Sequence, residues 1–252
     1  MEYAVDIRHL AKSFGTKTVL SDVSLQVPPG KSIVVMGGSG SGKSVLIKHI
    51  VGLLSPDAGE VWVQGRRLDL LQEEELNQTR LNIGYLFQSG ALFDSMSVFE
   101  NLGFILDRHR RLSAGERTDR IMETLSWVNL PDKAMQYPAE LSGGQKKRIG
   151  LARAIILKPA IMLYDEPTTG LDPVSVRAVS DLIVRLRDEQ GIASVAITHD
   201  LLCAEIITDS ASFLYEGRMI ASGTLRALQE NPHPVLRTFF GTDRNSEIPT
   251  PA

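Results

Sequence analysis

A glycine-rich turn between an apolar run and an amphipathic segment limits the fold of this chain more than any other feature. The run SIVVM at 32–36 leads into GGSGSGKS at 37–44, and the helical pattern VLIKHIVGLL follows. Glycines in such a turn let backbone N–H groups point at a phosphate, and Lys43 adds charge toward its outer oxygens. Ser44 is suited to bind Mg²⁺. We therefore predict strand, phosphate loop and helix in this order, because an ordinary strand-to-helix turn would need neither Lys nor Ser there.

Two further apolar runs predict a parallel sheet around this first strand. The segments 161–164 and 192–198 are short and continuously apolar, as is 32–36. Such strands are typical of a sheet that helices cover on both faces. The core is therefore expected to be α/β.

Alternating segments predict a separate antiparallel β lobe near the N-terminus. They comprise residues 3–10, 19–27 and 60–64. One face of the second segment is expected to carry Val19, Val23, Leu25 and Val27.

Residues 95–135 predict a helical insert. Ser97 with Glu100, and Ser113 with Glu116, have the spacing of capping boxes at helix N-termini.

Composition excludes several classes of function. The 252 residues carry a formal net charge of -3, so a nucleic-acid partner has no overall electrostatic support and none is expected. Cys203 is the single cysteine, which rules out an internal disulfide, and its apolar helical surroundings predict a buried thiol. No apolar run reaches the ~18 residues of a membrane-spanning helix. We expect a soluble, cytoplasmic protein without a signal peptide, whose work at a membrane would need partners.

Acidic residues and a histidine follow two of the predicted core strands. In IMLYDEP at 161–167, Asp165 ends a buried strand and can reach a metal, while Glu166 can orient or deprotonate water. His199 follows the next core strand at the same carboxyl edge, where it can meet the γ-phosphate and the attacking water. Taken singly, such residues are also common as structural features of strand ends.

A second glycine turn, in AELSGGQKKRIGLARAI at 139–155, has no lysine inside it. Ser142 and Gln145 fit a capping box on a helix that ends near Lys158-Pro159. Capping does not account for the two glycines, nor for the positive charges that oppose the helix dipole in the first turn, Lys146, Lys147 and Arg148. We interpret this turn as an anion site. Because the first loop already has its own lysine, the anion is expected to be a nucleotide presented by another chain.

Together and in this order, GGSGSGKS, LSGGQ, LYDEP, TTGLDP and ITHD resemble the ATPase subunit of ABC transporters. The resemblance implies the ABC ATPase fold: a P-loop NTPase core with a mostly parallel sheet, an N-terminal antiparallel β lobe and an α-helical insert. It implies Mg²⁺-dependent ATP hydrolysis in a head-to-tail homodimer, with ATP between the phosphate loop of one subunit and LSGGQ of the other. We expect one ABC ATPase domain over 1–240 with its helical subdomain at about 89–158. A polar tail at 241–252 is expected to be mobile or bound by another chain.

The resemblance also assigns roles to individual residues. Glu166, His199 and Gln88 are the implied catalytic residues, and the implied metal ligands are Ser44, Gln88 and Asp165. The implied nucleotide contacts are Phe14, Gly37, Gly38, Ser39, Gly40, Ser41, Gly42, Lys43, Ser44, Val45, Ser142, Gly143, Gly144, Gln145 and Asp172. Phe14 would stack on adenine, although an aromatic residue in a β lobe is also commonly part of the core. Asp172 would couple the dimer.

A finer resemblance concerns the ATPases of Mla and Mce-type lipid transport systems of bacterial envelopes and chloroplasts. It rests on SGKSVLIKHIVGLLSPDAGEV and YLFQSGALFDSMSVFENLGF, and on Val45, where most transport ATPases have threonine. It implies that the chain powers phospholipid transport from the cytoplasmic face of the inner membrane. The implied partners are membrane permease subunits, an Mce-domain substrate-binding protein and, in some systems, a small regulatory subunit.

Apolar residues beside Gln88 predict a docking surface for a permease helix, namely Phe87, Leu92, Phe93 and Met96. The alternative is that these four side chains belong to the core of the helical insert.

Two other functions stay open. The same ATPase can serve another cargo, because the cargo contacts the permease. A non-transport ABC ATPase for cluster assembly, translation or DNA repair is the other alternative. Translation relatives usually fuse two ATPase domains and repair relatives insert long coiled coils, and the sequence has neither feature.

Overall fold

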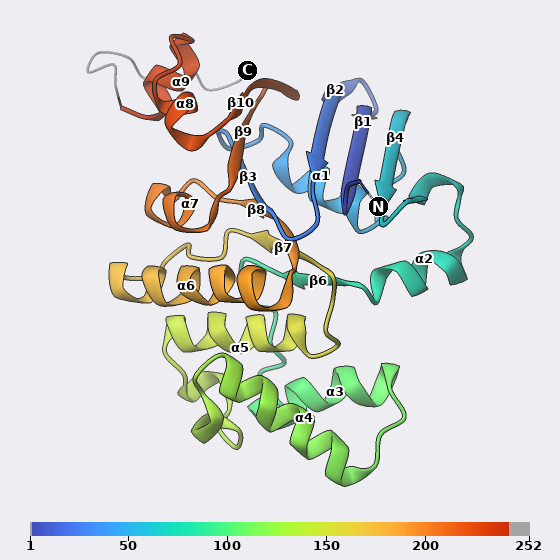
Figure 1. Cartoon of the computed structure of the whole chain (residues 1–252), viewed down its shortest axis with the longest axis vertical. Helices are drawn as coiled ribbons and strands as arrows, with labels where there is room; N and C mark the ends of the chain where they lie inside the picture. The colour runs from blue at the N-terminus through green and yellow to red at the C-terminus, as the bar shows by residue number, and fades with distance from the viewer. Residues whose placement is uncertain (1, 242–252) are drawn as a thin grey trace.

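The computed structural model describes residues 2–241, so most of the predicted tail at 241–252 lies outside the described residues. The smaller β-sheet lies toward the upper end of the molecule, the larger sheet extends from there to its middle, and the helical insert lies at the lower end (Figure 1). No helix in this described range is long and apolar enough to cross a membrane.

The larger sheet has the strand order β10-β9-β3-β8-β7-β6. Its members are β3 (Ser32–Met36), β6 (Ile83–Leu86), β7 (Ile161–Asp165), β8 (Ala193–Ile197), β9 (Ser210–Tyr215) and β10 (Arg218–Gly223). β3 is parallel to β8 and β9, β7 is parallel to β6 and β8, and β10 is antiparallel to β9. The predicted parallel core is therefore confirmed.

The smaller sheet is antiparallel, as predicted, with the order β2-β1-β4-β5. It comprises β1 (Val5–Phe14), β2 (Lys17–Val27), β4 (Ala58–Val63) and β5 (Arg66–Arg67). The predicted residues Val19, Val23, Leu25 and Val27 all contact one core, but Val19 is only partly buried and its neighbour Leu20 is buried as well. The backbone at Asp22 has φ 60°, and the register with β1 shifts between Val23 and Leu20, so strict alternation ends there.

Successive side chains of β3 enter two different cores. Ile33 and Val35 pack with β1, β2 and helix α1 (Lys43–Ile50), whereas Val34 and Met36 face the helices on the other side of the sheet. This alternation follows from the two-residue period of a strand. A continuously apolar sequence is therefore what β3 requires.

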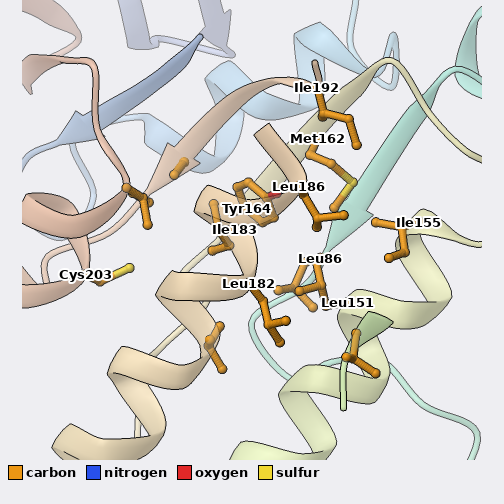
Figure 2. Close-up of a cluster of buried hydrophobic side chains, with 14 of the residues drawn as sticks. Leu86, Leu151, Ile155, Met162, Tyr164, Leu182, Ile183, Leu186, Ile192 and Cys203 are labelled. Carbon is orange, nitrogen blue, oxygen red and sulfur yellow. The ribbon is translucent and has the colours of Figure 1, made fainter. Parts of the chain in front are cut away.

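The second core lies between the strands β6 and β7 and three helices. These helices are α5 (Gly143–Ile155), α6 (Pro173–Gln190) and α7 (Leu201–Ile207). Figure 2 shows Met162 and Tyr164 of β7 among Leu151 of α5 and Leu186 of α6, with the sulfur of Cys203 at one side. Cys203 is buried, as predicted. Burial raises the pKa of its thiol to about 11, so the group is a neutral apolar filler at neutral pH.

The helical insert is formed by α3 (Val98–His109) and α4 (Ala114–Trp127), which pack against α5 (Figure 1). Both predicted capping boxes are present: Ser97 accepts from the backbone of Glu100, and Ser113 from that of Glu116.

The remaining elements surround the sheets. They are the short helices η1 (Leu68–Leu70), η2 (Pro131–Lys133) and η3 (Pro138–Glu140), and α2 (Glu73–Arg80), α8 (Leu225–Gln229) and α9 (Pro234–Phe239).

Candidate active site

The phosphate loop connects β3 to α1 and fits tightly between the two sheets. At Gly37, φ is 148° and a Cβ atom would lie 2.1 Å from the carbonyl oxygen of Leu214 in β9. At Gly42, φ is 108° and a Cβ would lie 2.7 Å from Leu20 Cδ2 in β2. Only glycine satisfies both the backbone conformation and the close approach at these two positions.

Lys43 lies across this loop. Its ammonium donates hydrogen bonds of 2.7 Å to the carbonyls of Gly37 and Gly38, and Ser41 Oγ is 3.4 Å away. Burial lowers the pKa of Lys43, while the charges of Glu166 and Asp165 act in the opposite direction. The loop lysine and the two acidic residues therefore lie in one electrostatic environment.

The other predicted catalytic groups follow the carboxyl ends of neighbouring parallel strands. Gln88 comes two residues after β6, Asp165 ends β7, and His199 comes two residues after β8. In parallel strands these ends share one edge of the sheet, which is where α/β proteins bind ligands.

The Glu166 carboxylate is held from two directions. His199 Nδ1 is 3.0 Å from Glu166 Oε1, and Thr169 Oγ1 donates to Oε2 at 3.0 Å. An ionised carboxylate only accepts hydrogen bonds, so Nδ1 carries the proton in this pair. The Glu166 side chain is 14% exposed and that of His199 is 61% exposed. This leaves an oriented carboxylate that is still partly exposed to solvent.

Asp165 has a partner that the sequence did not suggest. The hydroxyl of Tyr85 on β6 donates to Asp165 Oδ2 at 3.1 Å, and the Tyr85 ring stacks on Phe87. Burial and the Asp165 charge raise the pKa of Tyr85, so the phenol stays a proton donor. Tyr85 lies on β6 and Asp165 ends the neighbouring strand β7, so the contact depends on the pairing of two strands that are far apart in the sequence.

The side chains predicted to bind a divalent cation suit Mg²⁺, although they include only one carboxylate. Among residues 2–241, no group of His, Cys, Asp or Glu side chains is large enough to hold a metal by itself. The predicted ligands instead combine the hydroxyl of Ser44, the amide of Gln88 and the single carboxylate of Asp165. Mg²⁺ typically binds through one or two carboxylates together with substrate phosphates and water, so this set suits it.

The second glycine turn, residues 141–145 (LSGGQ) and called the signature turn below, is capped as predicted. Ser142 Oγ accepts from the Gln145 backbone at 3.3 Å, and Gln145 Oε1 accepts from the Ser142 backbone at 2.9 Å. Gly144 is also explained by packing, because a Cβ there would lie 2.8 Å from Ser175 Oγ at the start of α6. Gly143 is exposed, and a Cβ there would make only a 3.4 Å contact with Leu171.

The interpretation of the positive charges after this turn was wrong for two of the three. Lys147 is buried and donates to the carbonyls of Gln88 and Glu166, and Arg148 donates to the carbonyl of Val128. Both side chains therefore satisfy carbonyls of their own chain. The helical periodicity of α5 turns these two residues toward the protein.

Asp172 lies next to the signature turn through α6. Its carboxylate caps this helix by accepting from the backbones of Val174 and Ser175, and Ser175 Oγ donates to it at 2.6 Å. These hydrogen bonds lower the pKa of Asp172, the one from the Ser175 hydroxyl most strongly. The helix N-termini of α5 and α6 thus meet where Gly144 contacts Ser175.

Phe14 is not a core residue. It is 48% exposed at the end of β1, and the Lys12 ammonium lies 5.7 Å from its ring centroid. Val45, by contrast, is partly buried against the core beneath α1.

The apolar residues on either side of Gln88 in the sequence differ in their surroundings. Phe87 and Phe93 line a groove of about 450 Å³ together with Tyr85 and Phe104. Phe93 is 41% exposed and meets Phe104 edge to face with centroids 5.2 Å apart. Leu92 is partly buried against the main core and does not line the groove, so the core alternative holds for that residue.

Comparison with known proteins identifies the family. Residues 20–169 match the ABC transporter family. A chloroplast protein of Arabidopsis thaliana named trigalactosyldiacylglycerol 3 is 38% identical over 93% of this chain and 72% of its own. The intermembrane phospholipid transport system ATP-binding protein MlaF of Escherichia coli is 36% identical over 97% of this chain and 91% of its own.

Other relatives carry different names. A probable ribonucleotide transport ATP-binding protein, mkl of Mycobacterium leprae, is 37% identical over 98% of this chain and 72% of its own. Among solved structures, the dimeric post-hydrolysis state of the ATP-binding cassette MJ0796 with ADP and Pi superposes with a TM-score of 0.80. It is 31% identical and covers 88% of this chain and 99% of its own. On these matches and this geometry, the chain belongs to the ABC transporter family and is one of its ATP-hydrolysing, ATP-binding domains.

Proposed function

We propose that this chain is the ATPase of a phospholipid transporter and that it works as a head-to-tail homodimer. The observation that carries the hydrolytic part is the Glu166 carboxylate, which His199 and Thr169 hold near the loop of Lys43. The lipid part is supported by the similarity to MlaF, whose match covers nearly all of both chains. Cargo recognition itself is assigned to the permease.

Each residue group has a distinct task in this proposal. The loop 37–44 binds the phosphates through backbone N–H groups, with Lys43 moving from loop carbonyls to phosphate oxygens. Ser44, Gln88 and Asp165 would hold Mg²⁺, which when bound neutralises charge on the phosphates. Glu166 accepts hydrogen bonds from the attacking water, and His199 orients this carboxylate. Phe14 offers an exposed ring on which adenine can stack.

The neighbouring subunit completes each site in this proposal. Ser142, Gly143 and the N-terminus of α5 face outward, where a helix dipole favours an anion. Gly144 and Gln145 shape the turn, and Asp172 fixes the adjoining start of α6.

The proposed assembly extends beyond this chain. Permease subunits hold the dimer at the cytoplasmic face of the inner membrane, an Mce-domain protein handles the lipid, and a small regulatory subunit is an optional partner. The ABC ATPase domain is assigned to 1–240, with the helical subdomain at 89–158.

The Glu166→Gln variant tests the hydrolytic role. We expect it to bind Mg-ATP with wild-type affinity and to lose turnover by ~100-fold or more, since a positioned general base contributes about that much. Binding is measured with a fluorescent ATP analogue and turnover by phosphate release. The control is Glu205→Gln on α7, which changes the same charge at an exposed position. Wild-type turnover in Glu166→Gln would remove this residue from the mechanism.

Mixing two inactive variants tests whether Ser142 acts on the other subunit's ATP. Lys43→Ala disables the variant's own loop, and Ser142→Asp keeps a good helix cap but repels a phosphate. In random dimers half are mixed and each has one intact site, so activity should recover to roughly a quarter of wild type.

If Ser142 only caps α5, the Ser142→Asp homodimer should be active by itself, because aspartate is also a good helix cap. Thr224→Asp is the control, because Thr224 caps α8 through the same kind of hydroxyl contact. An active Ser142→Asp homodimer, or the absence of any recovery between folded variants that exchange subunits, contradicts a role in trans.

The groove of Phe87, Phe93 and Phe104 is tested with Phe93→Ser. We expect the thermal midpoint to shift by only about 2 °C, as for a surface change. Co-purification with the permease from membranes should be lost, because the apolar anchor is gone. Leu53→Ser, which alters an exposed apolar residue outside the groove, should co-purify normally. If Phe93→Ser also retains the permease, docking lies elsewhere.

Cargo is tested with the complex isolated from membranes and placed in vesicles. ATP should drive transfer of a fluorescent phospholipid between vesicles, and Glu166→Gln should abolish it. Radiolabelled ribonucleotide is offered in parallel, since one relative carries that name. Ribonucleotide uptake without lipid transfer would replace the lipid assignment while leaving the ATPase intact.

A further inference from the structure

The ammonium of Lys147 lies inside the protein between two loops of the site. It donates to the backbone carbonyl of Gln88 at 2.5 Å and to that of Glu166 at 2.9 Å. The residue is 6% exposed. Lys147 therefore touches the backbone at both residues whose side chains are assigned to water and metal.

Burying a lysine here is unfavourable, because an ammonium that leaves water loses its hydration and needs hydrogen-bond partners to replace it. Burial lowers the pKa of Lys147, although the charges of Glu166 and Asp165 oppose this shift. Its two hydrogen-bond partners are neutral carbonyls. An apolar side chain would fill the same space on α5 without this cost, so packing alone does not explain a lysine.

The loop after β6 is attached to α5 at further points. Arg153 donates to the carbonyl of Ala91, and a Cβ on Gly150 would lie 3.1 Å from Gly90 Cα. Together with the Lys147 contact, these fix the segment 88–91 along one side of α5. Gln88 can therefore move little without moving this helix.

The backbone of Glu166 also needs external support. Its φ is 50°, in the left-handed region that non-glycine residues adopt at some cost. Three hydrogen bonds hold it there: its N–H donates to the carbonyl of Ile197 at 2.9 Å, and its carbonyl accepts from Lys147 and, at 3.4 Å, from the backbone N–H of Thr169. The direction of the Glu166 carboxylate depends on this conformation.

We propose that Lys147 is a positioning residue that fixes the backbones of Gln88 and Glu166 relative to each other and to α5. The inference rests on the proposed roles of these two residues. Ser142 begins the same helix, one and a half turns before Lys147. A neighbouring subunit that contacts the start of α5 would therefore act, through Lys147, on the position of the Glu166 carboxylate in this chain's own site.

Lys147→Met tests this role, because it keeps length and apolar volume but removes all donors. We expect kcat to fall by about tenfold or more, since small misplacement of a catalytic group is costly, while ATP affinity changes less than about threefold. Lys147→Gln retains two N–H donors and should recover part of the lost kcat. A general loss of stability would not lower kcat while leaving ATP affinity nearly unchanged, and Lys147→Gln would not restore kcat in that case.

Arg120→Met is the matched control. Arg120 is also a partly buried cation, and it donates through Nε and Nη2 to the carbonyl of Ile156 at the other end of α5. We expect the Arg120→Met variant to have a lower thermal midpoint than the wild type, and the wild-type kcat at a temperature where both proteins are folded. Equal losses of kcat in Arg120→Met and Lys147→Met would show that the helix merely needs support, and would overturn the proposal.

Two further measurements keep the outcome decisive. Lys147→Leu replaces Lys147→Met if methionine prevents folding, and wild-type kcat in either folded apolar variant overturns the proposal. Glu166→Gln is assayed alongside. If it is inactive while Lys147→Met is normal, only the positioning role fails, whereas an active Glu166→Gln removes the hydrolytic role on which this inference rests.

Discussion

The close approach of the phosphate loop to both sheets is the constraint on which the rest of the structure depends. Gly37 lies against the carbonyl of Leu214, and Gly42 lies against Leu20. The antiparallel sheet and the parallel sheet are therefore fixed relative to each other at the loop itself. Since α1 starts in this loop and fills the core between the sheets, the nucleotide cradle and the packing of the two sheets form one unit.

Around this unit, hydrogen bonds fix the orientation of the acidic groups of the site. Glu166 is oriented by His199 and Thr169 at its carboxylate and by Lys147 at its carbonyl. Asp165 receives the hydroxyl of Tyr85. Catalytic groups held in this way need little reorganisation when charge develops at a substrate, which is the main source of electrostatic catalysis.

Sequence patterns were most informative where one residue type satisfies one local requirement. Continuous apolar runs predicted β3, β7 and β8, and capping spacings predicted the starts of α3, α4 and α5. The failures involve contacts between distant segments. The sequence pattern assigns Lys147 to an anion site, because its actual carbonyl partners lie 59 and 19 residues away. Tyr85 is likewise 80 residues from Asp165. The burial of Leu20 beside Val19 follows from the irregular backbone at Asp22, where φ is 60°, and from the register shift with β1.

The two-sided burial of β3 has a consequence for how this chain can change over evolutionary time. Ile33 and Val35 serve one core while Val34 and Met36 serve the other. A single residue inserted or deleted within this strand would move the side chains on one side of the change to the opposite core and shift the phosphate loop relative to Leu214. The strand can therefore accept apolar replacements of similar volume far more readily than a change in its length by one residue.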